Sequence, residues 1–285
     1  AVRATFDEAS AVLGYDLWQL AREGPESELA RTEITQPVML AAGFATWRAW
    51  CNAGGPAPAL LAGHSLGEYT ALVAAGALGF ADAVALVAER GRLMQDAVPL
   101  GEGAMAAVMG LDAGTLEDIC AAAAEGECVS CANYNAPGQI VIAGSTAAVG
   151  RAVEAARAAG AKRAVTLPVS APFHCALMQP AADGLRERLA ACDFSAPVIP
   201  VVHNIDAGMR AEPEAVREAL CAQASGPVRW TDCVAAMAAA GADRVVELGP
   251  GKVLTGLVRR IDRSLGALAV SDPDSLQAAM AEVTA

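Results

Sequence analysis

The sequence predicts an α/β fold in which a mainly parallel sheet is interrupted by an inserted ferredoxin-like subdomain. Between positions 100 and 168 the hydrophobic pattern runs strand, helix, strand, strand, helix, strand, which is the βαββαβ order of a ferredoxin-like unit. On both sides of this segment, short apolar strands alternate with helices, as is typical of a parallel sheet. We therefore expect a large α/β domain over 1–99 and 169–285, and a small ferredoxin-like subdomain over 100–168.

The first part of the large domain is predominantly helical. Apolar residues at three- and four-residue spacing predict helices over 1–14, 37–53 and 82–94. Between the last two, a short apolar run over 59–62 ends in a glycine and is followed by a helix over 67–75. Strand, sharp turn and helix is therefore the local plan there.

Cap and turn residues divide the small subdomain into six elements. Asp112 and Ser145 stand at expected N-cap positions, because their side chains can accept hydrogen bonds from the free N–H groups of a first helical turn. The segment Asn135-Ala136-Pro137-Gly138 has the composition of a turn. The expected strands are 104–109, 127–133, 139–143 and 162–167, and the expected helices are 112–124 and 145–159.

The chain after the small subdomain alternates again between the two element types. The expected helices are 181–191, 213–224 and 233–240, and the expected strands are 198–204 and 244–248. The last strand runs into Gly249-Pro250-Gly251-Lys252, which fails as a phosphate-binding loop because positions 246 and 253 are both Val. We interpret this segment as a tight strand-to-helix turn.

Composition limits the classes of function. Hydrophobic residues make up 54% of the 285 residues, which argues against disorder. The formal net charge of −12 argues against nucleic acid as a partner, because proteins that bind it present a basic surface. His64, Glu68 and Asp82 interrupt the most apolar region, 57–88, which argues against a membrane span. No charged-then-apolar leader opens the sequence. We expect a cytoplasmic protein and, separately, a monomer.

Eight cysteines are spread along the chain. At this length, such a distribution favours reduced thiols in the cytosol over a disulfide framework. Cys128 and Cys131 have the spacing of a metal or redox pair, but no second pair accompanies them and the chain has three histidines in all. We therefore predict no metal site.

A nucleophile motif stands at the predicted strand, turn and helix. Gly63-His64-Ser65-Leu66-Gly67 fits the G-x-S-x-G elbow, in which flanking glycines allow a sharp turn that holds the serine Oγ at the start of a helix. The backbone N–H of Leu66 can then face an oxyanion. A five-residue match can arise by chance, but the strand–turn–helix context that the motif requires is present.

A serine hydroxyl needs a base, and the three histidines are the candidates. His64 adjoins Ser65, and its side chain would point away from the hydroxyl at such a turn. His203 lies in a predicted strand, where a structural role is the better interpretation. His174 follows the last strand of the small subdomain, where the chain re-enters the large domain and could pass Ser65. The residues alone leave the role of His174 open.

Arg90 lies 25 residues after Ser65, on the helix predicted over 82–94. Most arginines are solvated at the surface, and the local sequence does not decide between that and burial. In a pocket, the guanidinium would bind a carboxylate through two parallel hydrogen bonds.

These residues closely resemble the malonyl-CoA:acyl carrier protein transacylases of bacterial fatty acid synthesis, along essentially the whole chain. One matching segment would be weak evidence, whereas six in the family's order are specific. The six are Thr35–Pro37, Gly63–Tyr69, Glu89–Gly91, Asn133–Gln139, Val169–His174 and Glu247–Leu254. The resemblance implies a hydrolase-like α/β core with a ferredoxin-like insert, as the hydrophobic pattern already predicts.

The resemblance implies a role for each matched residue. Ser65 would carry the malonyl ester, His174 would be its base and acid, and the backbone carbonyl of Gln223 would orient His174 in place of a carboxylate. Leu66 would supply one oxyanion-hole N–H, and Arg90 would pair with the malonyl carboxylate. Positions that line or border the pocket are Gln36, Met94, Asn133 and Phe173.

The implied reaction is a ping-pong transfer of malonyl from a CoA thioester to Ser65, then to the phosphopantetheine thiol of acyl carrier protein, without a cofactor. Acetyl would leave the buried arginine unpaired, and Phe173 leaves little room for an α-methyl branch. Carrier proteins are acidic, so docking on this acidic chain needs a basic patch. The candidates, which could equally be cations that only solvate helix faces, are Lys162, Arg163, Lys252, Arg259, Arg260 and Arg263.

One feature of the family is missing from the sequence. Family members begin with a strand and a Gly-Gln-Gly-Ser-Gln type loop, whose glutamine supplies a second oxyanion N–H, and the sequence starts after that segment. We therefore expect one strand and half of the oxyanion hole to be absent. Three alternatives stay open: an acyltransferase unit of a polyketide pathway, a serine esterase, which would need a triad carboxylate, and a non-catalytic carrier-binding fragment.

Overall fold

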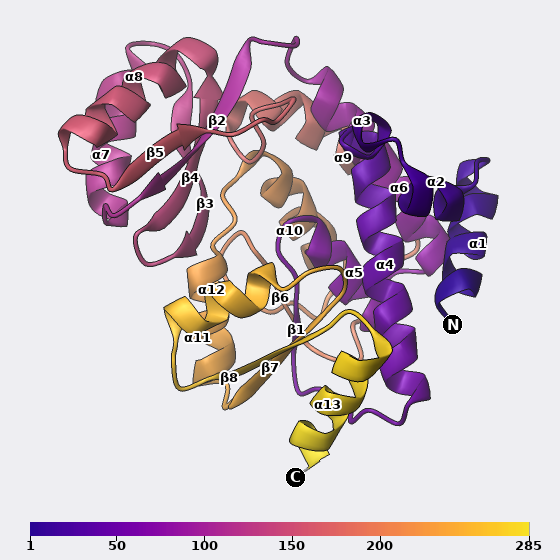
Figure 1. The fold of residues 1–285 in the computed structure, drawn as a ribbon. Helices are drawn as coiled ribbons and strands as arrows, with labels where there is room; N and C mark the ends of the chain where they lie inside the picture. Colours follow the sequence, from indigo (N-terminus) through magenta and orange to yellow (C-terminus); the bar gives the residue numbers. More distant parts are fainter. Residues whose placement is uncertain (285) are drawn as a thin grey trace.

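The computed structural model describes residues 1–284 and shows a helix-rich α/β body beside a smaller unit with its own sheet (Figure 1). The helices of the first hundred residues confirm the four predicted there and add two short ones. They are α1 (Val2–Leu13), α2 (Leu17–Glu23), α3 (Glu26–Leu29), α4 (Thr32–Asn52), α5 (Leu66–Ala74) and α6 (Phe80–Asp96).

Close packing of α4 on α6 forms the centre of the helical body. α4 starts at Thr32, earlier than predicted, and Pro37 lies inside it, where the missing N–H costs the helix a single hydrogen bond. A Cβ at Gly91 of α6 would lie 2.6 Å from Glu33 Cα, so only glycine allows the two helices to approach this closely. This approach brings the residues beside Gly91 against the first turns of α4.

The parallel strands form two pairs. β1 (Leu61–Ala62) pairs with β6 (Val201–Val202), and β7 (Arg244–Leu248) pairs with β8 (Gly266–Val270). The strand predicted over 198–204 is therefore wrong in extent, since only two of its residues join the ladder. Val198 instead donates its N–H to Ala75 O and is 80% exposed. β6 ends at Val202, and the next two residues, His203 and Asn204, are polar and fully buried.

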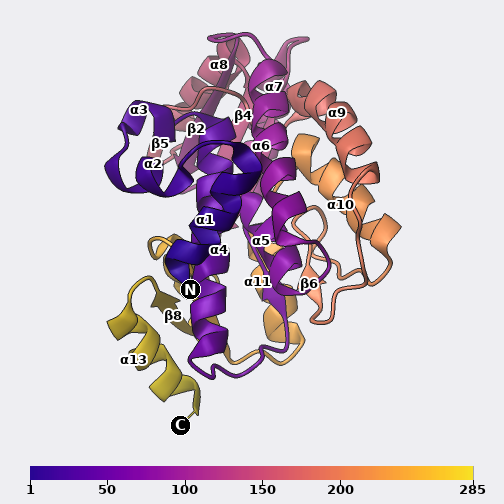
Figure 2. The ribbon, with the colours of Figure 1, turned by 90° about the vertical axis from the view of Figure 1, so that its right-hand side faces the viewer.

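The remaining helices surround these strands. In Figure 2, α9 and α10 lie side by side on one flank, and α13 lies at the opposite end beside the C-terminus. Sequence periodicity predicted the first three helices of this set. The fourth begins directly after Lys252 and confirms the strand-to-helix turn interpreted there, whereas the fifth was not predicted. The set comprises α9 (Gln179–Ala190), α10 (Pro213–Ser225), α11 (Trp230–Ala239), α12 (Val253–Ile261) and α13 (Pro273–Thr284), with a short 3₁₀ turn over Ala176–Met178.

The small unit has the predicted βαββαβ order. Its antiparallel sheet has the strand order β3-β4-β2-β5, and its two helices lie together on one face (Figure 1). This is the ferredoxin-like arrangement, so the predicted fold class is confirmed. The elements are β2 (Gly103–Met109), α7 (Ala113–Ala124), β3 (Val129–Ala136), β4 (Gln139–Ser145), α8 (Thr146–Ala158) and β5 (Arg163–Thr166).

Of the two predicted N-caps, one makes the expected hydrogen bond and the other does not. Asp112 Oδ1 accepts the Thr115 N–H at 2.9 Å, so this N-cap is confirmed. Ser145 occupies the N-cap position of α8, but its hydroxyl makes no cap bond and instead approaches Cys128 O at 3.4 Å. Ser145 is also the last residue of β4, and its backbone N–H donates to the same Cys128 O at 2.8 Å. The domain boundaries at 100 and 168 stay a prediction.

All eight cysteines are free thiols. Across residues 1–284, no helix combines the length and apolar character needed to span a bilayer.

Candidate active site

Ser65 stands at the sharp turn between β1 and α5. Its φ of 50° lies in the left-handed region, which is unusual for a residue with a side chain. A Cβ at Gly63 would lie 2.0 Å from the backbone of Gly67, so glycine is required at 63, whereas a Cβ at Gly67 would meet open space. The predicted elbow is present. Of its two glycines, only Gly63, which lies between β1 and Ser65, is required for steric reasons.

Ser65 Oγ lies 2.7 Å from His174 Nε2. His174 Nδ1 lies 2.9 Å from the main-chain oxygen of Gln223. A carbonyl oxygen can only accept, so Nδ1 carries the proton and Nε2 offers its lone pair to the serine hydroxyl. Burial, reinforced by the charge of Arg90, lowers the pKa of His174 to about 3. The imidazole is therefore neutral at pH 7 and able to accept a proton.

The guanidinium of Arg90 is buried beside the serine, with 2% of the residue exposed. Nη1 donates to Gln36 Oε1 at 2.6 Å, and Nη2 donates to Gln223 Oε1 at 3.0 Å and to Ser65 Oγ at 3.2 Å. Within the described chain, Nε has no partner. Burial lowers the pKa of Arg90, but an arginine remains charged at neutral pH. A buried cation bonded only to neutral oxygens can bind a carboxylate strongly.

Two polar residues that the sequence analysis did not assign to the site hold the elbow in place. Asn204 Oδ1 accepts the Ser65 N–H at 2.7 Å, and Asn204 Nδ2 donates to Gly63 O at 2.8 Å. Glu68 Oε2 accepts from the Asn204 N–H and from Gln223 Nε2, both at 2.9 Å. A charged residue in the apolar helix that follows Ser65 was an available signal for Glu68. No sequence pattern points to Asn204.

The other two histidines have partners of their own. His64 Nε2 lies 2.8 Å from Asn135 Oδ1, and its ring packs on Trp230. His203 Nδ1 lies 2.7 Å from Glu68 Oε1. Of the three histidines, His174 is the one whose ring nitrogen lies within hydrogen-bond distance of the Ser65 hydroxyl.

Three of the four predicted pocket residues lie close to one another, and the fourth, Asn133, does not share their contacts. Gln36 Nε2 lies 3.9 Å from Met94 Sδ, and Phe173 packs against the apolar cluster that contains Met94. Phe173 also lines a cavity of about 460 Å³ between the start of α4 and residues 168–170. Asn133 is buried on β3, and within residues 1–284 no hydrogen bond joins its side chain to the serine, the histidine or the arginine.

Leu66 is the first residue of α5. Its N–H therefore has no carbonyl one turn earlier in the helix to bond. This N–H adjoins the Ser65 Oγ and is available to an oxygen that gains negative charge there.

The chain is similar to known acyltransferases along nearly all of its length. Residues 1–277 match the acyl transferase domain family. The chain is 55% identical over 279 residues to the malonyl CoA-acyl carrier protein transacylase of Escherichia coli K12, covering 98% of this chain and 90% of that protein. The family follows from this match.

The chain belongs to the malonyl CoA-acyl carrier protein transacylase family.

Solved structures of transacylases agree with this assignment. The acyl-carrier-protein S-malonyltransferase of Burkholderia pseudomallei 1710b superposes with a TM-score of 0.97 at 54% identity, over 98% of this chain and 91% of that one. A malonyl-transacylase solved in complex with a type II PKS acyl-carrier protein gives a TM-score of 0.97 at 52% identity, over 99% of this chain and 91% of that one. The resemblance predicted from six sequence segments is confirmed.

The basic residues considered for docking in this transacylase lie in two groups that meet. Arg163 at the start of β5 and Gln139 at the start of β4 both stand opposite Met109 in the small sheet. Arg260 on α12 donates to Gln139 Oε1 at 3.0 Å. Arginines from two distant parts of the sequence therefore flank one end of the small sheet.

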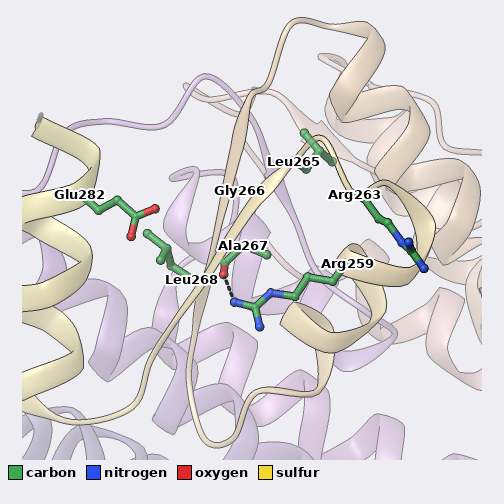
Figure 3. Close-up of a pocket in the computed structure, with 7 residues that line it drawn as sticks. All are labelled: Arg259, Arg263, Leu265, Gly266, Ala267, Leu268 and Glu282. Atoms are coloured by element: carbon green, nitrogen blue, oxygen red, sulfur yellow. Dashed lines mark hydrogen bonds between the residues drawn. The ribbon is translucent and has the colours of Figure 1, made fainter.

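Arg259 is engaged elsewhere. A cavity of about 560 Å³ lies between α12, β8 and α13, and Arg259 and Arg263 are among its lining residues (Figure 3). Arg259 Nη2 donates to Ala267 O at 2.9 Å (Figure 3). Because this bond fixes the guanidinium on β8, Arg259 is less free to meet a partner than Arg260.

Proposed function

We propose that this chain transfers a malonyl group from malonyl-CoA to the phosphopantetheine thiol of an acyl carrier protein, through a malonyl ester on Ser65, in fatty acid biosynthesis. One observation carries the proposal: the buried Arg90 guanidinium lies 3.2 Å from the Ser65 Oγ and bonds only to neutral oxygens. A thioester whose acyl group ends in a carboxylate fits this pair. The carboxylate would meet Arg90 while the thioester carbonyl carbon lies at Ser65 Oγ. Relatives named for the same transfer support the proposal.

In the first half-reaction, His174 Nε2 accepts the hydroxyl proton as Ser65 Oγ attacks the thioester carbonyl carbon. The Leu66 N–H faces the carbonyl oxygen as it becomes negative, and the Gln223 carbonyl stabilises the imidazolium through Nδ1. The C–S bond then breaks, and the CoA sulfur leaves with the proton from Nε2. The imidazolium thus acts as the general acid for the leaving thiolate and returns to its neutral form.

The second half-reaction runs the same steps with the carrier thiol as nucleophile. The thiol gives its proton to His174 and attacks the ester carbonyl, and Ser65 Oγ leaves with that proton. Because the substrate thioester is already activated, the reaction needs no cofactor. Acetyl would leave the Arg90 charge unpaired, at a cost of about 1–3 kcal/mol or more, and Phe173 restricts the space for an α-methyl branch.

Arg163 and Arg260 make the end of the small sheet the docking site that we propose for the acidic carrier. Lys162 adjoins Arg163, and Lys252 stands exposed at the start of α12. The sheet end is close to the nucleophile, because Asn135 on β3 bonds His64, the residue before Ser65. A carrier held there by charge could present its phosphopantetheine to the serine. We further propose that the chain acts as a cytoplasmic monomer without nucleic acid or membrane partners.

Mass spectrometry after mixing with malonyl-CoA tests the proposal. A stable mass gain of one malonyl group on Ser65, absent in Ser65→Ala, is the expected result. Rapid release of free malonate would instead indicate an esterase, and full labelling of Ser65→Ala would contradict the assignment of the nucleophile.

Polyketide synthesis is the second candidate pathway. The observation that favours it is the similar malonyl-transacylase that was solved with a type II PKS acyl-carrier protein. Transfer rates from the labelled enzyme to carriers of the two pathways, measured in parallel, separate them, and we expect the fatty acid carrier to react faster.

A further inference from the structure

Glu68 lies at the centre of the polar network beneath the reacting serine, on the first turn of α5. Its side chain is fully buried. Its carboxylate oxygens accept three hydrogen bonds. The donors are the His203 Nδ1 at 2.7 Å, the Asn204 N–H at 2.9 Å and the Gln223 Nε2 at 2.9 Å. Within the described residues, Glu68 has no hydrogen bond to Ser65 Oγ, His174 or Arg90, so any effect on the reaction must pass through its neighbours.

The Gln223 side chain connects Glu68 to Arg90. Its Nε2 donates to Glu68 Oε2 at 2.9 Å and to Ser65 O at 3.0 Å. Its Oε1 accepts from Arg90 Nη2 at 3.0 Å. Turning this amide over would aim its N–H groups at the guanidinium and its oxygen at the Glu68 carboxylate. Both contacts would be repulsive, since a guanidinium only donates and a carboxylate only accepts.

This arrangement leaves Arg90 with a negative charge nearby but not in contact. A carboxylate bonded directly to Arg90 would occupy the N–H groups that a substrate carboxylate needs. An uncompensated buried cation, however, would be costly. The Gln223 amide separates the Glu68 carboxylate from Arg90, so the negative charge compensates the guanidinium without occupying all of its N–H groups. This arrangement requires that Gln223 Oε1 points at Arg90.

We infer that Glu68 is a positioning residue for malonyl selectivity: its carboxylate fixes the direction of the Gln223 amide and thereby holds Arg90 open toward the substrate. The inference rests on the proposed function, in which Arg90 binds the malonyl carboxylate. Glu68 itself touches neither the substrate nor the reacting atoms.

Three substitutions separate hydrogen-bond direction from charge. Glu68→Met keeps an unbranched side chain of similar length and removes the acceptor. Glu68→Asp keeps the charge but shortens the reach toward Gln223. Glu68→Gln removes the charge and keeps an acceptor, because its carbonyl can face Gln223 and Asn204 while its amide donates to the other tautomer of His203. Glu247→Met is the matched control, since Glu247 accepts from the Leu254 and Thr255 N–H groups at the start of α12, away from Arg90.

The measurement is the ratio of malonyl to acetyl transfer to Ser65, taken on one sample of each variant together with its unfolding temperature. A general loss of folded protein lowers both rates and leaves the ratio unchanged. We expect Glu68→Met to lower the ratio about 10-fold or more, the scale of one lost bond to a charged group. Glu68→Asp should lower it less, and Glu68→Gln and Glu247→Met should keep it within about 2-fold, below the change that one such bond produces.

The inference is overturned if Glu68→Met and Glu68→Asp keep the unaltered ratio, or if Glu247→Met lowers the ratio as much as they do. Should Glu68→Met fail to fold, the comparison of Glu68→Asp with Glu68→Gln decides: a lower ratio in Asp alone supports positioning, and equal ratios refute it. Failure of the proposed function is distinct, because the unaltered chain would then form no malonyl ester on Ser65.

Discussion

The two sheet-bearing parts of the molecule bury different kinds of side chain. The core between the small sheet and its helices is apolar, with Leu116, Ile142 and Val149 at its centre. Of the eleven buried polar or charged residues in the described chain, Asn133 alone lies within 100–168, and the other ten lie in the α/β body. Eight of those ten form one hydrogen-bonded network around Ser65: Thr32, Gln36, Glu68, Arg90, His174, His203, Asn204 and Gln223.

This difference separates two uses of a protein interior. An apolar core stabilises the fold and tolerates changes that preserve its volume. A buried polar network adds little net stability, because each group loses solvation that its partner only restores. Substitutions in the polar network should therefore change rate and selectivity, with a further loss of stability where a buried partner is left unsatisfied. Substitutions in the apolar core should change the free energy of unfolding alone.

Replacing the base should produce the largest effect on rate. In His174→Ala, we expect both half-reactions to slow by more than about 100-fold, the usual scale for a lost general base. Rapid-quench measurement of malonyl-Ser65 formation and of its transfer to the carrier tests each half separately. A variant that keeps near-native rates would move the role of base to another residue.

The next largest effect should be on selectivity. Arg90→Ala should reduce malonyl transfer far more than acetyl transfer, because removing one partner of a buried charge pair costs about 2–5 kcal/mol. The ratio of the two rates is the readout. An unchanged ratio would mean that Arg90 does not contact the malonyl carboxylate, whatever happens to the overall rate.

The apolar core of the small unit should respond in the opposite way. Ile142 is fully buried, so Ile142→Ala should lower the free energy of unfolding by about 2–5 kcal/mol. Urea unfolding measures this loss, and active-site titration with malonyl-CoA gives the rate per folded molecule, which should not change. A large change in that rate would show that the two interiors are coupled.

A smaller effect is expected at the surface. Reversing charge in the double variant Lys252→Glu, Arg260→Glu should raise the Michaelis constant for the carrier several-fold, because exposed charges act mainly on encounter. The constant for malonyl-CoA should stay nearly unchanged. Equal effects on both would refute docking, since the phosphates of CoA would then be the ligand of these cations.

The smallest expected effect is on the acid side of the pH profile. The pKa of His174 is lowered from 6.5 to about 3, so activity per folded molecule should stay flat from pH 7 to about pH 5. Stability should behave differently. The unfolded chain binds this proton more tightly, so the contribution of His174 is complete above about pH 6.5 and is lost as the pH falls toward 3. An activity midpoint near pH 6.5 would contradict the lowered value.

The small unit was the easier part to predict. Its hydrophobic pattern gave the six elements in order, because one face of the sheet and both helices share one apolar core. The other face of the sheet packs in a second cluster, in which Met105 and Val141 meet Cys175. The length of the strand over 198–204 was overestimated because its apolar residues have different environments. Val198 is exposed, whereas Val201 pairs with β1. Periodicity reports that a segment is apolar, but it does not report which neighbour the segment meets.

The site shows the same limit. Ser65 was predictable because its elbow is local, and His174 and Arg90 followed from segments matched to a family. Gln223 followed from the same resemblance, through its place ahead of Gly226-Pro227-Val228. Asn204 was not predictable, because it meets Ser65 across 139 positions of sequence and a single asparagine after a short strand carries no signal. Glu68 was quoted within a motif, but its role depends on three donors that only the fold brings together.

The nucleophile and the base that we propose both have left-handed backbones, with φ of 50° at Ser65 and 62° at His174. A residue with a side chain in that region costs roughly 1–3 kcal/mol, so the chain would fold more favourably with glycine at either place. A laboratory selection for heat resistance alone would therefore tend to enrich variants that have lost the nucleophile or the base. Selection for a more thermostable variant of this protein must therefore screen for catalytic activity as well as for the unfolding temperature.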